Sequence, residues 1–197
     1  MNQYHKSKKC TLKDVRKRPP KRPKILKYSK YLQGLDKDIQ EMGFEEKELE
    51  CFRIGHDPMS INDALPQKFF PERKVPKPLP PVFWEQQEQK DKRKYISSCT
   101  LSHFRTEEEC MKMYNDRFEK DLLNMDRKKA IAKKKKFGTH IIKMKYKKGD
   151  GLFSPTGPSG HIELLEYEGL DIRDRTDKSY KAKVIFEEDY EENANSH

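Results

Sequence analysis

The feature that most constrains this chain is its charge layout. Lysine and arginine gather in two blocks, residues 1–30 and 120–148, whose combined positive charge exceeds the formal net charge of +10 of the whole chain, and the last thirty residues are acidic. Only 33% of residues are hydrophobic and 39% are charged, against roughly 45–50% apolar and about 25% charged in typical globular chains. Apolar burial must offset roughly 1–2 kcal/mol of backbone entropy per ordered residue. We therefore expect a mostly extended or irregular chain with α-helices and no large globular core, ordered by a partner.

Shifts in composition divide the chain into six expected segments. These are a basic, proline-containing extended arm (1–34), a short helix (35–56), a proline-rich extended spacer with aromatic anchors (57–84), a linker or short helix (85–105), an amphipathic helix with a basic block (106–148), and a Gly/Pro loop with an acidic tail (149–197).

The strongest local signal predicts one long amphipathic helix over residues 107–136. Thr106 and Glu109 match the capping box, in which each side chain bonds the other residue's backbone amide. Acids fill the first turn and lysines the last, as the helix dipole prefers. A second helix is expected over 36–54, where apolar residues fall roughly on one face. Alternating apolar and lysine residues over 141–147 predict one short strand with a basic face.

Aromatic residues make up 10% of the chain, more than disordered sequences usually contain. Spaced aromatic and apolar side chains in a charged chain suit a protein that places anchors in pockets of a larger partner. Those of the helix pack either on the chain itself or on that partner. The predicted partner-docking residues are Phe69, Phe70, Phe83, Trp84, Met111, Tyr114, Phe118 and Leu122.

The sequence gives no sign of enzyme chemistry. Its six histidines are scattered, and none has metal-ligand spacing with a cysteine or another histidine. The glycine-containing loops at 149–151 and 157–160 lack the lysine and Ser/Thr that end a phosphate loop. We therefore expect no enzyme activity, no catalytic or metal site, no cofactor and no small-molecule substrate.

The basic blocks predict binding to an acidic polymer. Lysine and arginine clusters bind polyanions by releasing counterions. The preference for lysine over arginine suits a diffuse acidic surface such as that of tubulin, and nucleic acid remains the alternative. The candidate residues are Arg16, Lys17, Arg18, Lys21, Arg22, Lys24, Lys128, Lys129, Lys133, Lys134, Lys135 and Lys136.

The tail contains one short motif, Lys183-Val184-Ile185-Phe186 followed by acids. It is similar to the docking motif of protein phosphatase 1 regulators. In an extended chain Val184 and Phe186 point the same way, into two apolar pockets, while the backbone adds a strand to the partner. The resemblance implies a phosphatase-docking role for Lys183, Val184 and Phe186. An acidic tail that folds back on the basic blocks is the other interpretation.

These observations favour an intracellular, non-enzymatic structural protein. No secretory signal opens the chain, and no apolar run is long enough to cross a membrane. A general likeness to short proteins rich in Lys, Pro and Tyr makes a microtubule-associated or ciliary-axoneme component our first expectation. A nuclear, nucleic-acid-associated protein is the first alternative, and a phosphatase-docking regulatory protein is the second.

Overall fold

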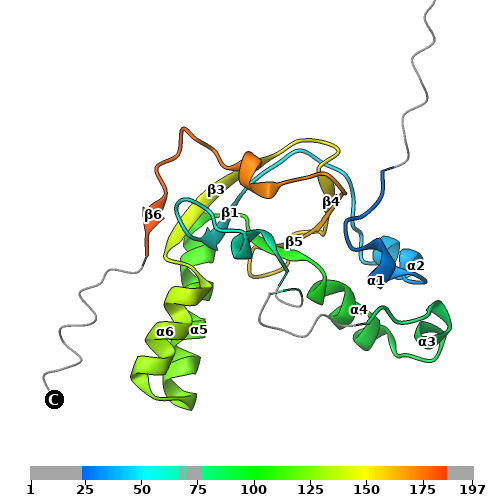
Figure 1. Ribbon diagram of the computed structural model, residues 1–197, viewed down its shortest axis with the longest axis horizontal. Coiled ribbons are helices and arrows are strands. Elements are labelled where there is room, and N and C mark those ends of the chain that lie inside the picture. The colour runs from blue at the N-terminus through cyan, green and yellow to red at the C-terminus, as the bar shows by residue number, and fades with distance from the viewer. Residues whose placement is uncertain (1–23, 67–68, 70–76, 186–197) are drawn as a thin grey trace, which may run out of the picture.

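An antiparallel sheet forms the centre of the protein. The computed structural model describes residues 24–66, 69 and 77–185. Its six strands lie in the order β4-β5-β2-β1-β3-β6, and every neighbouring pair is antiparallel (Figure 1). The strands are β1 (Leu49–Gly55), β2 (Leu101–Phe104), β3 (His140–Tyr146), β4 (Gly151–Phe153), β5 (His161–Glu166) and β6 (Lys183–Val184).

Helices lie at opposite ends of this sheet. The small helices α1 to α4 gather at one end, and α5 and α6 form a hairpin that projects from the other (Figure 1). The helices are α1 (Ser29–Leu32), α2 (Asp36–Glu41), α3 (Pro81–Glu85), α4 (Gln89–Ser98), α5 (Glu107–Asn124) and α6 (Arg127–Phe137), with 3-10 helices η1 (Asn62–Ala64) and η3 (Ile172–Arg175). None of these helices is both long and apolar enough to span a bilayer.

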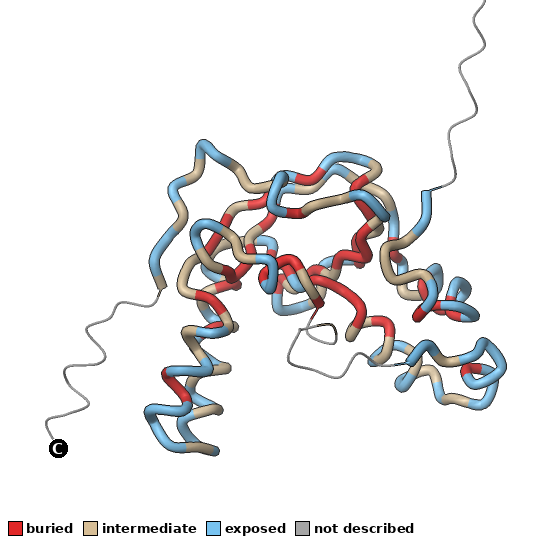
Figure 2. Tube along the Cα trace, in the orientation of Figure 1, coloured by how far each residue is buried: buried red, intermediate tan, exposed pale blue. Residues whose placement is uncertain are grey.

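The expectation of a mostly extended chain without a large core is wrong. The sheet carries a buried core that includes Ile141, Phe153 and Leu164, all fully buried (Figure 2). Whole-chain composition underestimated this core, because the strongly polar sequence of residues 1–23 and 186–197 lowers the average. Leucine and isoleucine are the most frequent residues of the core, with tyrosine, cysteine, methionine and histidine among the others. Tyr146, for example, is buried and accepts or donates a hydrogen bond of 2.8 Å with the buried His103 ring. Such pairing removes the cost of burying these polar groups.

The prediction of a single helix over residues 36–54 is also wrong. Helix α2 ends at Glu41, and Gly43 follows with φ +75°, a left-handed conformation that ends helices. From Leu49 the chain is a strand, paired with β3 from Leu49 opposite Tyr146 to Gly55 opposite His140. The strand predicted over 141–147 is β3, and its pairing with β1 outweighs the helical spacing of the apolar residues. The fold therefore gains a central strand where one helix was expected.

The long helix predicted over 107–136 is two helices. The capping box is confirmed: Glu109 N donates to Thr106 Oγ1 over 3.2 Å, and Thr106 N donates to the Glu109 carboxylate over 3.0 Å. Helix α5 ends before Met125, whose backbone is extended, and Asp126 starts α6 by accepting hydrogen bonds from the Lys128 and Lys129 amides. An aspartate that caps competes with a continuous helix at this position. The two helices pack side by side as a hairpin.

The remaining expected segments contain more regular structure than their composition indicates. Residues 57–84 include η1 and part of α3, and residues 85–105 include α4 and β2. The loop and tail after 149 contribute β4, β5, η3 and β6. Residues 1–23 of the basic arm and 186–197 of the tail lie outside the described residues.

Candidate functional site

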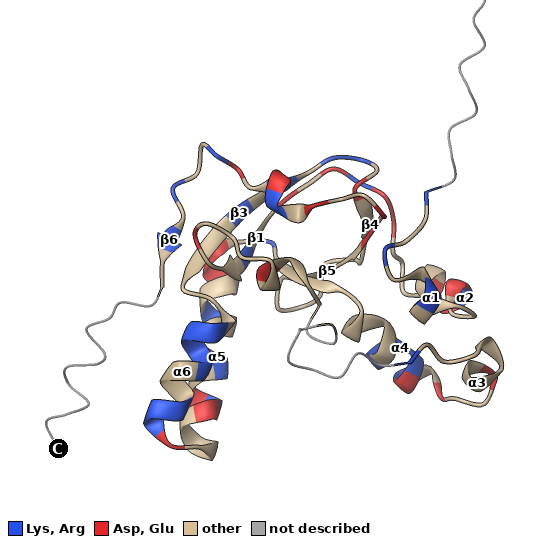
Figure 3. Cartoon of the chain, viewed as in Figure 1, with Lys and Arg blue, Asp and Glu red and all other residues tan. Residues whose placement is uncertain are grey.

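Helix α6 carries a dense group of lysine and arginine residues (Figure 3). We call Arg127, Lys128, Lys129 and Lys133 the lysine-rich face; all four are exposed. Lys133 contacts the Asp121 carboxylate of α5 at 2.5 Å. Among the residues that the structure describes, the other three have no acidic partner. The face therefore retains uncompensated positive charge.

The other candidate polyanion-binding residues of α6 differ from this face. Lys134 Nζ lies 4.3 Å from the ring centre of Tyr114 and 4.2 Å from that of Phe118. Burial lowers the pKa of Lys134. These cation–π contacts make Lys134 part of the hairpin packing. Lys135 accepts a hydrogen bond from His56 through its carbonyl, and Lys136 lines a pocket described below.

Lysines of the sheet are neutralised by neighbours. Lys143 Nζ lies 2.8 Å from the Glu50 carboxylate, and Lys145 Nζ lies 3.1 Å from that of Asp177. Hydrogen bonds from Ser179 and Lys145 lower the pKa of Asp177 to about 2. The basic side of β3 is thus an ion-pair cluster rather than an open cationic face.

The first block of candidate polyanion residues lies mostly outside the described range. Arg16, Lys17, Arg18, Lys21 and Arg22 belong to it, and Lys24 is the first described residue. Lys24 Nζ contacts the Glu46 carboxylate at 2.8 Å and lies 5.2 Å from the Tyr167 ring centre.

Many predicted partner-docking residues pack inside the protein. Tyr114 is 1% exposed and Trp84 3% exposed, and the Tyr114 hydroxyl donates to the Gly138 carbonyl over 2.8 Å. Phe69 stacks on Tyr28 with ring centres 4.2 Å apart. Met111 and Phe118 are half-buried, Phe83 and Leu122 are exposed, and Phe70 lies outside the described residues.

The phosphatase-like segment lies on an edge of the sheet. Val184 pairs with His140 across β3 and β6, and its side chain is half exposed. Ile185 packs against the core beneath the hairpin. The side chains of Val184 and Ile185 therefore point to opposite faces, as successive side chains of an extended strand do. Lys183 contacts the Glu107 carboxylate at 2.5 Å, and Phe186 lies outside the described residues.

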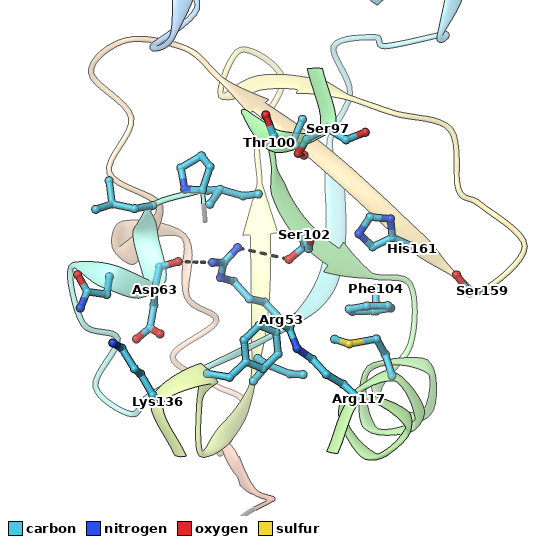
Figure 4. Close-up of a pocket in the computed structure, with 18 residues that line it drawn as sticks. Arg53, Asp63, Ser97, Thr100, Ser102, Phe104, Arg117, Lys136, Ser159 and His161 are labelled. Atoms are coloured by element: carbon cyan, nitrogen blue, oxygen red, sulfur yellow. Dashed lines mark hydrogen bonds between the residues drawn. The ribbon is translucent and has the colours of Figure 1, made fainter. Parts of the chain in front are cut away.

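A pocket of about 520 Å³ opens where β1, β2 and the hairpin meet (Figure 4). Arg53 of β1 lies at its centre and is 8% exposed. Its two terminal nitrogens donate to the backbone carbonyls of Asp63 and Ser102, and its Nε is buried without a partner. Within the described part of the chain, no carboxylate pairs with this guanidinium. The buried Glu166 carboxylate interacts with this guanidinium electrostatically, but its ion pair is with Lys27. The hydrogen bonds of Arg53 reach only carbonyl groups, and burial removes much of the hydration of its charge.

More basic and polar groups surround this guanidinium. Arg117 of α5, Lys136 of α6 and His161 of β5 also line the pocket (Figure 4). The Arg117 guanidinium lies 4.3 Å from the ring centre of Phe137 and forms no ion pair with any described residue. A second hollow, of about 630 Å³, shares Phe104, Met113, Arg117 and Ser159 with the pocket and extends along α5. The remaining polar wall consists of hydroxyl groups from Ser97, Ser98, Thr100, Ser102 and Ser159.

Ser60, His56 and Asp63 lie together beside the pocket, but their hydrogen bonds are not those of a catalytic triad. The His56 Nδ1 lies 3.0 Å from the Asp63 carboxylate, and its Nε2 lies 3.0 Å from the Lys135 carbonyl. The Ser60 hydroxyl donates directly to Asp63 over 2.9 Å. Both ring nitrogens are therefore engaged, and neither faces the hydroxyl as nucleophile activation requires. Across the described ranges, no group of three or more His, Cys, Asp or Glu side chains is arranged to hold a metal ion.

Sequence reasoning missed the Arg53 pocket. Arg53 and Arg117 belong to different elements, and only the packing of α5 against β1 brings them to one cavity. A charged residue inside a strand is normally assigned to the solvent side. The sequence contained no spacing signal for either arginine.

Comparisons with protein-family models, with curated proteins and with solved structures found no match. The assignment of function therefore depends on the geometry of this chain.

Proposed function

We propose that this protein is a non-enzymatic binding protein that attaches to an acidic protein surface through the lysine-rich face of α6. The supporting observation is a run of three consecutive exposed basic residues at the start of one helix, none with a carboxylate partner among the described residues. Lys24, Lys143 and Lys145 each have a carboxylate neighbour, whereas Arg127, Lys128 and Lys129 have none among the described residues. Open charge on an ordered helix is available to an external partner.

The position of this charge strengthens the proposal. Arg127, Lys128 and Lys129 occupy the first turn of α6, and no acid lies there. The amino-terminal end of a helix has a partial positive charge, so basic side chains in the first turn are unfavourable. The Asp126 carboxylate offsets part of this unfavourable interaction, because it caps the helix by accepting hydrogen bonds from the Lys128 and Lys129 amides. Folding alone gives no reason for three basic residues at this position, whereas an acidic partner would.

An acidic protein suits the face better than nucleic acid does. Single-stranded nucleic acid binding usually uses aromatic rings that stack on bases. The rings nearest the face, Tyr114 and Phe118, are covered by the Lys134 ammonium. The face is also mainly lysine, which binds as a point charge rather than as a planar fork. A glutamate-rich filament surface such as that of microtubules, in the cytoskeleton or a cilium, is the partner we propose. The basic residues 1–30 would add to this attraction.

Sedimentation with stabilised microtubules tests this proposal. Lys128→Gln with Lys129→Gln should weaken binding about fivefold at low salt, from roughly 0.5 kcal/mol per exposed charge. The matched control, Lys90→Gln with Lys94→Gln in α4, removes the same charge from exposed positions at the other end of the sheet and should bind almost like wild type.

Three results would contradict the proposal. They are equal weakening by both double variants, no sedimentation of the wild type, and tighter binding to a double-stranded DNA oligonucleotide than to microtubules at physiological salt. The last would favour the nuclear alternative.

A phosphatase-docking role is a second proposal, supported by the half-exposed Val184 on edge strand β6. Val184→Ala with Phe186→Ala should abolish capture of protein phosphatase 1 by the purified full chain. Lys178→Ala, at an exposed position before the motif, serves as the control. Unchanged capture by the first pair would end this proposal.

A further inference from the structure

The Arg53 pocket carries an inference that is independent of the lysine-rich face. Its central guanidinium is buried, donates only to backbone carbonyls, and has an Nε with no partner among the described residues. Burying a charge is costly unless an opposite charge accompanies it. An anion in the adjoining cavity would supply that missing charge.

The lining of the pocket suits an anion that meets the guanidinium groups of Arg53 and Arg117. Three basic side chains and one acidic one line it. The acid, Asp63, is engaged by the His56 ring and by the Ser60 amide and hydroxyl. Figure 4 shows Arg117 reaching from α5 toward Arg53. Guanidinium groups are planar donors that fit phosphate oxygens. The Thr100 and Ser98 hydroxyls already donate to the carbonyls of Ser97 and Tyr95, so the further hydroxyl groups of the lining are those of Ser97, Ser102 and Ser159.

Cavity size and its apolar wall indicate what carries the anion. A cavity of about 520 Å³ is large for a bare phosphate ion and typical for a small organic ligand. Ile54, Leu65, Phe104 and Met113 provide apolar surface beside the basic groups. We propose that the pocket binds a phosphate monoester carried on a small, apolar or aromatic organic body.

Calorimetric titration of the full chain with phenyl phosphate tests this site. Phenyl phosphate should bind at least about tenfold more tightly than inorganic phosphate, because the latter leaves the apolar wall empty. Arg117→Gln should weaken the binding about tenfold or more. Arg105→Gln is the matched control, since Arg105 is exposed, pairs with Glu109 and does not line the pocket. In amide NMR spectra, phenyl phosphate should shift signals of β1 and β2 around the pocket.

Arg53→Met gives an independent measurement. The variant should lose phenyl phosphate binding yet fold, because a methionine removes the buried charge while filling part of the same space. If Arg53→Met fails to fold, Arg117→Gln still tests whether the pocket binds phenyl phosphate, because Arg117 is only half-buried. Lys128→Gln with Lys129→Gln should bind phenyl phosphate like wild type, which separates this site from the lysine-rich face.

Several outcomes would overturn the assignment. They are a dissociation constant for phenyl phosphate weaker than about 10 mM, equal binding by Arg117→Gln, and NMR shifts confined to α6. If inorganic phosphate bound as tightly as phenyl phosphate, the proposal that the ligand carries an apolar or aromatic organic group would be wrong. A phosphotyrosine peptide that binds at least about tenfold more tightly than phenyl phosphate would identify a protein as the source and contradict the small-molecule assignment.

Discussion

Lysines in β3 and in α6 lie in opposite electrostatic environments, although the two segments are neighbours in the chain. In β3, Lys143 and Lys145 share the carboxylates of Glu50 and Asp177. At the start of α6, Lys128 and Lys129 face solvent, and no carboxylate of the described chain pairs with them. The first set belongs to the fold, and the second is available to a partner. A basic block in a sequence therefore does not by itself identify a binding surface.

The same contrast holds for apolar side chains. The sheet buries Leu101, Leu164 and Leu165, of which Leu164 is fully buried. The far end of the hairpin leaves Leu122 39% exposed and Leu123 86% exposed. We conclude that the sheet supplies most of the stability and that the hairpin tip is a surface element. Paired substitutions in the sheet and in the hairpin test this difference.

The largest effect is expected in the core. Leu164→Ala should lower the free energy of unfolding by about 2–5 kcal/mol, because it leaves a cavity among packed side chains. Leu123→Ala, the matched change at the hairpin tip, should alter it by less than about 0.5 kcal/mol. Urea unfolding measures both. Comparable losses from the two variants would mean that the tip is as important to folding as the sheet.

A smaller effect is expected from the two helix caps. Thr106 caps α5 where this helix contacts β1, β2 and β3, so Thr106→Ala should cost about 1 kcal/mol of global stability. Asp126 caps α6 away from the sheet, and the start of α6 can fray without unfolding the core. Asp126→Ala should therefore lower global stability by less than Thr106→Ala does. The reverse order, measured in the same urea series, would contradict the division between sheet and tip.

The smallest effect is a pH dependence at the lysine pair of β3. The pKa of Asp177 is lowered from 3.8 to about 2 in the folded protein, so its ionised form favours folding. That contribution is complete above the unfolded pKa and is lost as the pH falls from about 4 toward 2. The difference in melting temperature between wild type and Asp177→Asn should narrow over this range. The exposed Asp174 provides the control substitution, Asp174→Asn. A difference that stays constant or widens on acidification would rule out the ionised Asp177 carboxylate as its source.

Local signals in the sequence predicted local structure well. The Thr106 capping box and the alternating residues of β3 depend on near neighbours, and both are present. The helix over 36–54 failed because apolar residues of Leu49–Gly55 fit either a helical face or a strand, and only pairing with β3 decides between them. The break at Met125 was missed because Asp126 is also tolerated inside a helix. Competing tertiary contacts thus decided the two helix predictions that failed.

Amino-acid composition could not predict the core or the pocket. Fully or nearly fully buried His103, Arg53 and Glu166 count as polar residues in a sequence. In the fold, Glu166 contacts Lys27 at 3.1 Å, and His103 and Arg53 have their own hydrogen-bond partners. These partners lie far away along the chain. A polar residue that will be buried in this way cannot be distinguished from a surface one before the fold is known.

Amide hydrogen exchange on the isolated full chain is the most direct test of the central claim, that this protein folds around its own sheet and leaves the α6 tip as an exposed binding element. We predict that amides of β1 and β3 exchange slowly, through global unfolding, and that amides in the first turns of α6 exchange much faster. Fast exchange throughout β1 and β3 until an acidic partner is added would contradict the claim.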